Sequence, residues 1–384
     1  MEYPETRNLK PETMKTKERR HDIDWLRVIA IGLLLIYHIA IIYQPWAMFL
    51  AFIRSEELWE GLWKPMTMLN VWRIPILFYV SGMGVYFAMR KRNWLKLILE
   101  RTKRILIPFL FGIVAITPLH FFVFQKFYNM PLDYYAHFGH LWFLGNIFVY
   151  VLLLLPFFLV LKKHKNNLIK RHLEKLFSHP IGPLVVTLFF IAEVLILKPQ
   201  LFAMYAETWH GFFMGLLAFF FGFIFMYIGK PLWDTLLNWR WLYLSIAAIL
   251  FTIRFVAFDT QGLSYLTAIE SNAWIFTVFG FCYKYLNKPG KTLSYLSQAA
   301  YPVYIIHMIM LYGAAYFILP LHWHPVLSFV TITVITFAGC FIVYEFVLRR
   351  ITVLRPLFGL KWKFSFSKKN TDKIQLNQTA KERP

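Results

Sequence analysis

Long apolar segments alternate with short basic segments along this chain. An apolar helix of about 18 to 25 residues, at about 1.5 Å per residue, crosses roughly 30 Å of hydrocarbon. Ten segments meet this description, so the pattern predicts an all-α polytopic membrane protein with about ten transmembrane helices. The predicted spans are residues 22–44, 66–89, 103–124, 139–161, 181–198, 207–228, 240–258, 262–286, 294–318 and 325–348.

Composition supports this prediction, and the placement of charge orients the chain. The 384 residues are 58% hydrophobic and 16% charged, with a mean hydropathy of +0.51. The net charge of +21 suggests nucleic acid, but 34 of the 41 Lys and Arg residues are spread over the two terminal segments and alternate connecting segments instead of one surface. Basic residues collect in cytoplasmic loops. We therefore expect a multi-pass protein of the cell (inner) membrane with both termini in the cytoplasm and no nucleic-acid partner.

Three regions follow from this division. Residues 1–21 form a basic cytoplasmic N-terminal segment, residues 22–348 a membrane domain, and residues 349–384 a basic cytoplasmic tail that we expect to be disordered towards its end. The two cysteines, Cys282 and Cys340, fall in different predicted helices without metal-ligand spacing, so we expect neither a disulfide nor a metal site.

Ionisable residues inside the predicted spans are the first candidates for chemistry. A charge at the bilayer centre costs at least about 2.5 to 3.5 kcal/mol, which favours a functional role or an internal pair. Arg27 and His38 are eleven residues apart, so they share a helix face and stand about 16 Å apart along its axis. The simpler interpretation is that Arg27 reaches lipid headgroups while His38 hydrogen-bonds to a neighbouring helix.

Two further signals lie next in the chain. Ser81 and Gly82 are polar or small positions in the second span and are usual at helix packing sites. Arg101 and Arg104 begin the third span on one face, where paired guanidinium groups suit a phosphate, although ordinary positive-inside anchoring explains them equally well.

The second half of the chain adds polar residues at outer or central depth. Trp142 lies in the segment His140–Leu144, which is typical of an interfacial aromatic belt, whereas His307 lies deep within its span. Further buried charges are expected at three positions, whose roles the sequence leaves open: Glu193, Arg254 and Glu270. Together these residues predict a polar cavity that opens outwards, or a set of structural pairs.

Five short motifs occur in the order found in the membrane acyltransferase-3 family, which this chain resembles over about residues 20 to 350. The segments Arg20–Arg27 and Asn70–Pro75 are most similar to the branch that succinylates periplasmic glucans. The five motifs are Arg27 with His38, Phe78–Gly82, Arg101 with Arg104, His140–Leu144 and Tyr301–His307.

This resemblance implies an O-acyltransferase that moves an acetyl or succinyl group from cytoplasmic acyl-CoA to a hydroxyl of an extracytoplasmic glucan, another cell-surface glycan or a lipid-linked sugar. His38 is then the general base, with a covalent acyl-histidine as an alternative. The resemblance further implies that Arg27, Arg101 and Arg104 bind the coenzyme A phosphates. It implies catalytic roles for Ser81 and His307, in oxyanion stabilisation or acceptor positioning, and substrate binding by Arg73, Trp142 and Glu270.

Two other functions fit the same polar residues. In a proton-coupled transporter or flippase, buried His, Arg and Glu side chains carry protons or bind an anionic or sugar-containing solute, but the chain shows no inverted repeat of the kind such proteins often have. In a sensor or scaffold, the polar residues form structural pairs only. The acyl donor, the acceptor and any periplasmic partner are left open by the sequence.

Overall fold

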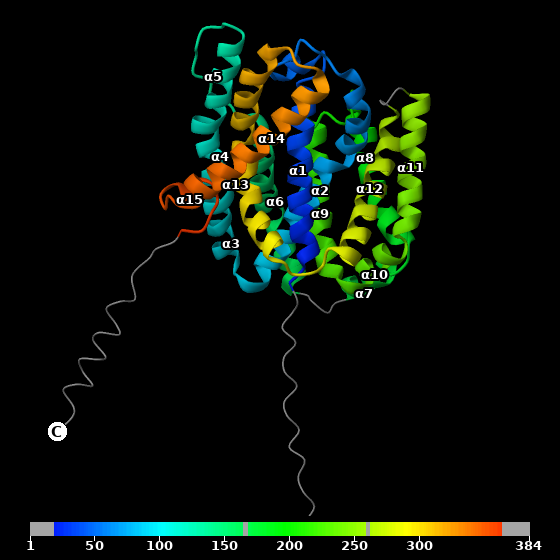
Figure 1. Ribbon diagram of the computed structural model, residues 1–384. Coiled ribbons are helices and arrows are strands. Elements are labelled where there is room, and N and C mark those ends of the chain that lie inside the picture. Colours follow the sequence, from blue (N-terminus) through cyan, green and yellow to red (C-terminus); the bar gives the residue numbers. More distant parts are fainter. Residues whose placement is uncertain (1–18, 164–167, 259–261, 363–384) are drawn as a thin grey trace, which may run out of the picture.

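The fold is a bundle of helices whose axes run mostly along one direction (Figure 1). A computed structural model describes residues 19–163, 168–258 and 262–362, and within these ranges there is no strand. The predicted all-α class is therefore confirmed. Most of the N-terminal segment 1–21 and the distal tail from residue 363 lie outside the described residues.

The first half of the chain forms six helical units. The polypeptide connecting α1 to α2 contains two short 3-10 turns, Ala47–Leu50 and Glu60–Leu62. The units are α1 (His21–Ile41), α2 (Trp63–Lys91), a rod built from α3 (Trp94–Arg101), a π turn at Thr102–Leu106, α4 (Ile107–Phe111), a π turn at Gly112–Ile116 and α5 (Thr117–Phe127), then α6 (Trp142–Lys163), α7 (Leu168–Phe177) and α8 (Ile181–Leu197).

The second half contains α9 (Trp209–Ile228), α10 (Lys230–Asn238), α11 (Arg240–Ala257), α12 (Ser264–Tyr285), α13 (Lys291–Ile318), α14 (Pro325–Val343), a π turn at Tyr344–Leu348 and α15 (Leu354–Leu357). Three helices, α7, α10 and α15, lie in segments predicted to be connecting loops or tail. They are too short and too polar to resemble membrane spans in the sequence, and α7 and α10 lie at the end of the bundle where α1 begins (Figure 1).

Within the part of the chain that the structure describes, eight helical segments are long and apolar enough to cross a membrane by length and composition. The bent pair α7 and α8, with 101° between them, makes a ninth if counted as one span. Helix α12 occupies the predicted span 262–286 but includes Glu270, Ser271 and Asn272, which lower its hydropathy. The structure thus confirms a multi-pass helical protein, and the number ten remains a prediction.

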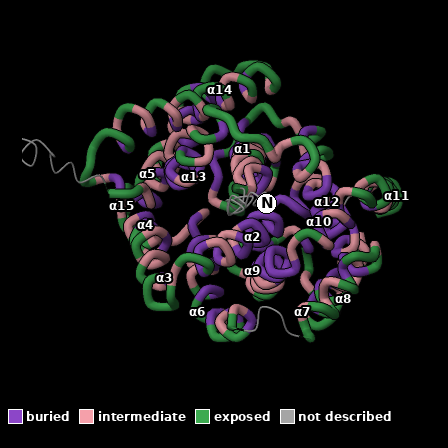
Figure 2. Tube along the Cα trace, turned by 90° about the horizontal axis from the view of Figure 1, so that it is seen from below, coloured by how far each residue is buried: buried purple, intermediate pink, exposed green. Residues whose placement is uncertain are grey.

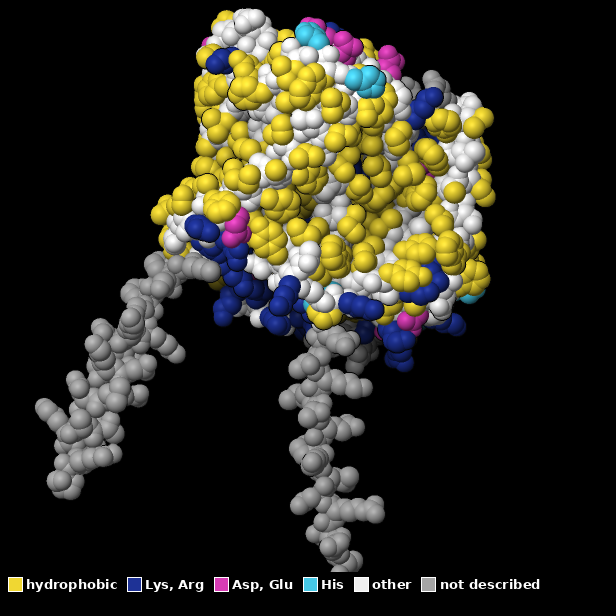
Figure 3. Space-filling view, viewed as in Figure 1, with side chains coloured by type: hydrophobic (Ala, Val, Ile, Leu, Met, Phe, Trp, Pro, Cys, Tyr) yellow, Lys and Arg dark blue, Asp and Glu magenta, His cyan; other side chains and the backbone are white. Residues whose placement is uncertain are grey.

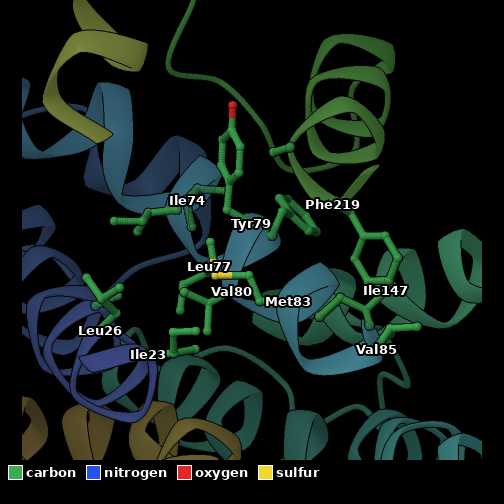
Figure 4. Close-up of a cluster of buried hydrophobic side chains, with 14 of the residues drawn as sticks. Ile23, Leu26, Ile74, Leu77, Tyr79, Val80, Met83, Val85, Ile147 and Phe219 are labelled. Atoms are coloured by element: carbon green, nitrogen blue, oxygen red, sulfur yellow. The ribbon is translucent and has the colours of Figure 1, made fainter. Parts of the chain in front are cut away.

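Helices α2, α9 and α13 form the centre of the bundle. Buried residues make up 78%, 72% and 67% of their apolar windows, against 17% for α11 and 22% for α14 at the periphery (Figure 2). The close-up in Figure 4 shows the central cluster, in which Leu77 and Met83 of α2 lie between Leu26 of α1 on one side and Ile147 of α6 and Phe219 of α9 on the other.

Two glycines allow α2 and α9 to cross in backbone contact. A Cβ at Gly82 would lie 1.9 Å from the carbonyl oxygen of Phe219, and a Cβ at Gly222 would lie 2.0 Å from the carbonyl oxygen of Tyr79. Only glycine fits at either position, as at other close crossings in membranes. The interpretation of Gly82 as a packing residue is consistent with this contact.

Pro75 shapes α2 next to the residues of interest. Proline has no N–H, so the carbonyl of Val71 loses its usual partner within the helix. Two side chains from elsewhere donate to that oxygen: the Tyr205 hydroxyl at 3.1 Å and Ser271 Oγ at 2.7 Å. Burial raises the pKa of Tyr205, in the loop before α9, well above its ordinary value, so its hydroxyl remains a donor. The helix is therefore held in place by its neighbours at this point.

Positive side chains gather at the end of the bundle where α1 begins and α2 ends, which we call the basic end (Figure 3). Hydrophobic side chains cover most of the visible face between the two ends, as expected for contact with lipid (Figure 3). The basic end includes residues from five places in the chain: Arg20 before α1, Arg92 between α2 and α3, Arg104 in the first π turn, Lys162 at the end of α6 and Lys230 at the start of α10.

Candidate active site

A histidine pair lies in the half of the bundle opposite the basic end. His38 Nδ1 of α1 is 2.9 Å from His307 Nε2 of α13, and the two rings are stacked with centroids 5.1 Å apart. The structure therefore brings together two predicted site residues that are far apart in the sequence. His307 is fully buried, whereas His38 is half-buried.

The neighbouring backbone fixes the protonation pattern of this pair. His307 Nδ1 lies 2.6 Å from the carbonyl oxygen of Tyr304, which can only accept, so Nδ1 bears the proton. In the neutral pair, His307 Nε2 must then accept from His38 Nδ1–H. The lone pair of His38 is thereby placed on Nε2, an atom with no hydrogen bond among the described residues. This is the arrangement expected of a base or nucleophile oriented by a second group.

Two more histidines extend the pair. The ring of His140 lies edge-on to His307 with centroids 4.9 Å apart, and that of His120 lies 5.9 Å from His140. His140 is held by two contacts with α13: its Nε2 donates to the carbonyl of Ile305 at 3.1 Å, and its own carbonyl accepts from the Tyr304 hydroxyl at 2.6 Å. The 3-10 turn Gly139–Leu141, directly before α6, thus contacts the segment of α13 that contains His307.

His120 and Tyr304 were not predicted as site residues. His120 lies within the predicted span 103–124, so its intramembrane position was a usable signal. The contact of the Tyr304 carbonyl with His307 lies within α13, three residues apart. Nothing in the sequence could indicate that the Tyr304 hydroxyl also donates to His140, because that contact depends on how α13 meets the segment before α6.

Arg73 of α2 is a buried cation beside the histidine pair. Its guanidinium carbon lies 4.0 Å from the ring centre of Tyr37, the residue before His38, and it is close enough to act electrostatically on His38 and His307. Its Nε and Nη1 atoms have no hydrogen-bond partner, and no carboxylate among the described residues pairs with it. The predicted substrate-binding residue thus has unused donors near the candidate base.

Ser81 and Glu270 are engaged elsewhere. Ser81 Oγ donates to the carbonyl of Leu77 at 2.8 Å, one turn back in its own helix. Glu270 is buried and accepts two bonds from Arg254, at 2.6 and 2.8 Å, while Arg254 also donates to the carbonyl of Thr67. The structure shows no contact of either Ser81 or Glu270 with the described histidine pair, and their predicted roles remain predictions.

Glu193 likewise lies in a structural pair. Its carboxylate is 2.8 Å from Nδ1 of buried His210, whose Nε2 donates to the carbonyl of Phe202 at 2.9 Å. The Phe202 carbonyl can only accept, so Nε2 of His210 must bear a hydrogen. The contact between Nδ1 and the Glu193 carboxyl group then needs one further proton between those two atoms. The pair joins α8 to the start of α9.

Arginines predicted to bind phosphate converge near the basic end. Arg101 Nη2 donates to the carbonyl of Gly84 at 3.3 Å, and a Cβ at Gly84 would lie 3.9 Å from Arg27 Nη2. Arg27 is 3.6 Å from Asp24, and Arg104 is 3.5 Å from Glu100. Arg27 and Arg101 therefore meet at Gly84, a residue that the sequence did not single out.

An uninterrupted α1 connects this arginine cluster to the histidine pair. Arg27 and His38 both lie within His21–Ile41, so helix geometry places them about 16 Å apart along its axis. The one-helix geometry predicted from their spacing is present.

Trp142 lines a separate cavity at the end opposite the basic end. The cavity has a volume of about 260 Å³ and lies where α6 and α9 begin. The lining of the cavity combines aromatic and polar side chains: Phe138, Trp142, Asn146, Glu207, Thr208, Trp209 and Phe212. Glu207 in this lining has φ of +60°, in the left-handed region, which costs energy for a residue other than glycine.

The fold and these residues define a polytopic helical membrane protein with a buried histidine pair and a remote arginine cluster. A family model described as an acyltransferase domain, Acyl_transf_3, matches residues 20–345. The chain belongs to the acyltransferase-3 family and is a membrane acyltransferase. No curated protein and no solved structure shows significant similarity to it.

Proposed function

We propose that this acyltransferase moves an acetyl or succinyl group from acyl-CoA, bound at a cytoplasmic basic end, to a hydroxyl of an extracytoplasmic glucan or other cell-surface glycan. The observation on which the proposal depends is the free lone pair of His38 Nε2, held in that tautomer by His307 and the Tyr304 carbonyl. The proposal places the protein in a cell inner membrane, and the positive-inside rule supports an orientation with the basic end in the cytoplasm.

Coenzyme A fits the distance between the two clusters. Arg27 and Arg101 meet at Gly84 and offer guanidinium groups to phosphates, and Arg104 lies on the same helical rod. The pantetheine arm then runs along α1 for the roughly 16 Å to His38, so the thioester reaches the base while the nucleotide stays at the aqueous face.

The reaction needs one proton acceptor. His38 Nε2 takes the proton of the acceptor hydroxyl as its oxygen attacks the thioester carbonyl, and the hydrogen bond to His307 supports the resulting imidazolium. The C–S bond breaks when the tetrahedral oxyanion collapses, and the thiolate recovers the proton from His38. In the alternative route, the lone pair of His38 Nε2 itself attacks the thioester and forms an acyl-histidine, which the acceptor hydroxyl then attacks. Ping-pong kinetics would distinguish this route from direct transfer.

The cavity containing Trp142 suits a sugar acceptor. Aromatic rings present flat apolar surfaces, and Asn146 and Glu207 add groups that hydrogen-bond to hydroxyls. We place the glycan there during its approach, with Trp142 against one face of a sugar ring.

The test begins with donor binding by the purified full chain in detergent. Acetyl-, succinyl- and free coenzyme A should raise the melting temperature of the wild type, and the double variant Arg101→Ala, Arg104→Ala should lose that shift while its ligand-free melting temperature is retained. No shift with any of the three in a folded sample would remove the donor site and favour a transporter.

The second arm measures transfer of labelled acyl groups to a glucan. His38→Gln should reduce the rate by about 10² to 10⁴, the usual contribution of a general base. His172→Gln is the matched control, because His172 is exposed on α7. Equal rates for His38→Gln and the wild type would refute the assignment.

A further inference from the structure

Three arginines are buried among the described residues, and Arg73 differs from the other two in how its charge is satisfied. Arg355, near the C-terminal end of the described chain, donates to the carbonyls of Arg349 and Lys361. Arg254 is held by both oxygens of Glu270, at 2.6 and 2.8 Å. Arg73 is only 2% exposed, yet its Nε and Nη1 atoms have no partner and no carboxylate among the described residues 19–163, 168–258 and 262–362 pairs with it. A desolvated, charged group without a neighbouring anion is costly, so it marks a place where a ligand supplies the missing negative charge.

The position of Arg73 is set firmly by its surroundings. It lies two residues before Pro75, where Tyr205 and Ser271 donate to the Val71 carbonyl that the proline leaves free. Its guanidinium stacks over Tyr37 at 4.0 Å. The Arg73 side chain therefore does not reach towards water or headgroups.

The groups facing Arg73 supply no negative charge. Tyr37 and His38 come from α1, His307 from α13 and Tyr205 from the loop before α9; each acts on Arg73 or is acted on by it electrostatically, and none is a carboxylate. The rings of Tyr37 and His38 have centroids 6.1 Å apart. Arg73 thus contacts Tyr37, the residue next to the candidate base His38.

The chemistry of the reactants decides what the anion is. The proposed phosphate sites lie near the basic end, about 16 Å along α1 from His38, and the hydroxyls of a neutral glycan bear no charge. An oxyanion exists only during reaction and leaves the resting charge uncompensated. A carboxylate on the acyl group meets the requirement, because it is present throughout donor binding and forms strong hydrogen bonds with guanidinium.

We propose that Arg73 binds the free carboxylate of a short dicarboxylic acyl group, such as succinyl, while the thioester carbonyl of the same group lies against His38. This inference depends on the proposed acyl transfer and selects among its donors. Arg73 is then a specificity-determining residue: a donor with a methyl group in place of the carboxylate leaves the guanidinium unpaired and is rejected.

Succinyl-CoA and butyryl-CoA form a matched pair of probes, since both acyl groups have four carbons and only the first has a carboxylate. In the wild type, kcat/KM for succinyl-CoA should exceed that for butyryl-CoA by at least about 100-fold. In Arg73→Gln the succinyl value should fall by a similar factor while the butyryl value stays within about threefold, so the ratio collapses. Arg73→Lys should retain part of the preference, because it keeps the charge but loses the planar fork.

Binding without turnover separates the ground state from the transition state. In the His38→Gln background, Kd for succinyl-CoA should rise by at least about tenfold when Arg73→Gln is added, and Kd for butyryl-CoA should not. The melting temperature of the ligand-free variants checks folding, which should persist because replacing Arg73 leaves no orphaned carboxylate.

The outcomes are distinct. Equal loss with both donors would overturn the inference and assign Arg73 to the oxyanion. Equal use of both donors by the wild type would also overturn it while leaving acyl transfer standing. Failure of every thioester to bind the folded wild type would refute the proposed function itself, and this inference with it.

Discussion

Adding one methyl group at Gly82 should separate the two central helices. In Gly82→Ala the new Cβ would meet the carbonyl oxygen of Phe219 at 1.9 Å and its carbon at 2.9 Å. An ordinary contact begins near 3.4 Å, so α2 and α9 must move apart locally by about 1.5 Å. Both clashing atoms are backbone and cannot rotate away.

The cost follows from this geometry. Overpacking a tight interior costs about 1 to 3 kcal/mol and occasionally more, and a backbone clash belongs at the upper end. Replacing glycine by alanine inside a helix returns up to about 1 kcal/mol. We therefore expect Gly82→Ala to lower the free energy of unfolding by about 2 to 3 kcal/mol.

The matched control lies two residues further along the same helix. A Cβ at Gly84 would meet nothing closer than Arg27 Nη2 at 3.9 Å, so Gly84→Ala should be neutral or slightly stabilising. Unfolding of the purified variants in mixed detergent, followed by tryptophan fluorescence, gives both values. Equal stability of Gly82→Ala and Gly84→Ala would refute the reasoning about the crossing.

Three further variants test the polar contacts. Arg254→Met should cost about 3 to 5 kcal/mol by orphaning the buried carboxylate of Glu270, and adding Glu270→Met should recover most of it in thermal unfolding; an equally unstable double variant would contradict this. Tyr205→Phe should cost about 1 to 3 kcal/mol in the same assay, since a donor to the Val71 carbonyl is lost, and unchanged stability would count against that bond. His307→Gln should lower kcat while KM for the donor changes little, and an unchanged kcat would argue against a positioning role.

Hydrophobic patterning was enough to predict where the helices lie. The predicted spans 181–198 and 325–348 match Ile181–Leu197 and Pro325–Leu348 closely, because uninterrupted apolar runs have one stable conformation in lipid. Helices α7 and α10 were missed, since a short amphipathic segment at an interface has the same composition as a charged loop.

The candidate site was predictable only in part. The proximity of His38 to His307 was not evident, as their spacing in the sequence gives no distance in space, although both were selected as ionisable residues in apolar spans. The bond of Ser81 to Leu77 illustrates the opposite difficulty. A hydroxyl in a helix can serve a ligand or its own backbone with the same local sequence, and the choice depends on neighbouring helices.

The bond between His38 and His307 also determines when the protein can become active during its synthesis. These residues are 269 positions apart, and His38 lies in α1, which leaves the ribosome long before α13. His38 therefore lacks its hydrogen-bond partner His307 until α13 has been made and inserted. Because the chain is made from its N-terminus, a partly synthesised chain contains the arginines proposed to bind the donor but lacks the oriented base. Under the proposed mechanism, acyl transfer therefore begins only after α13 is in place.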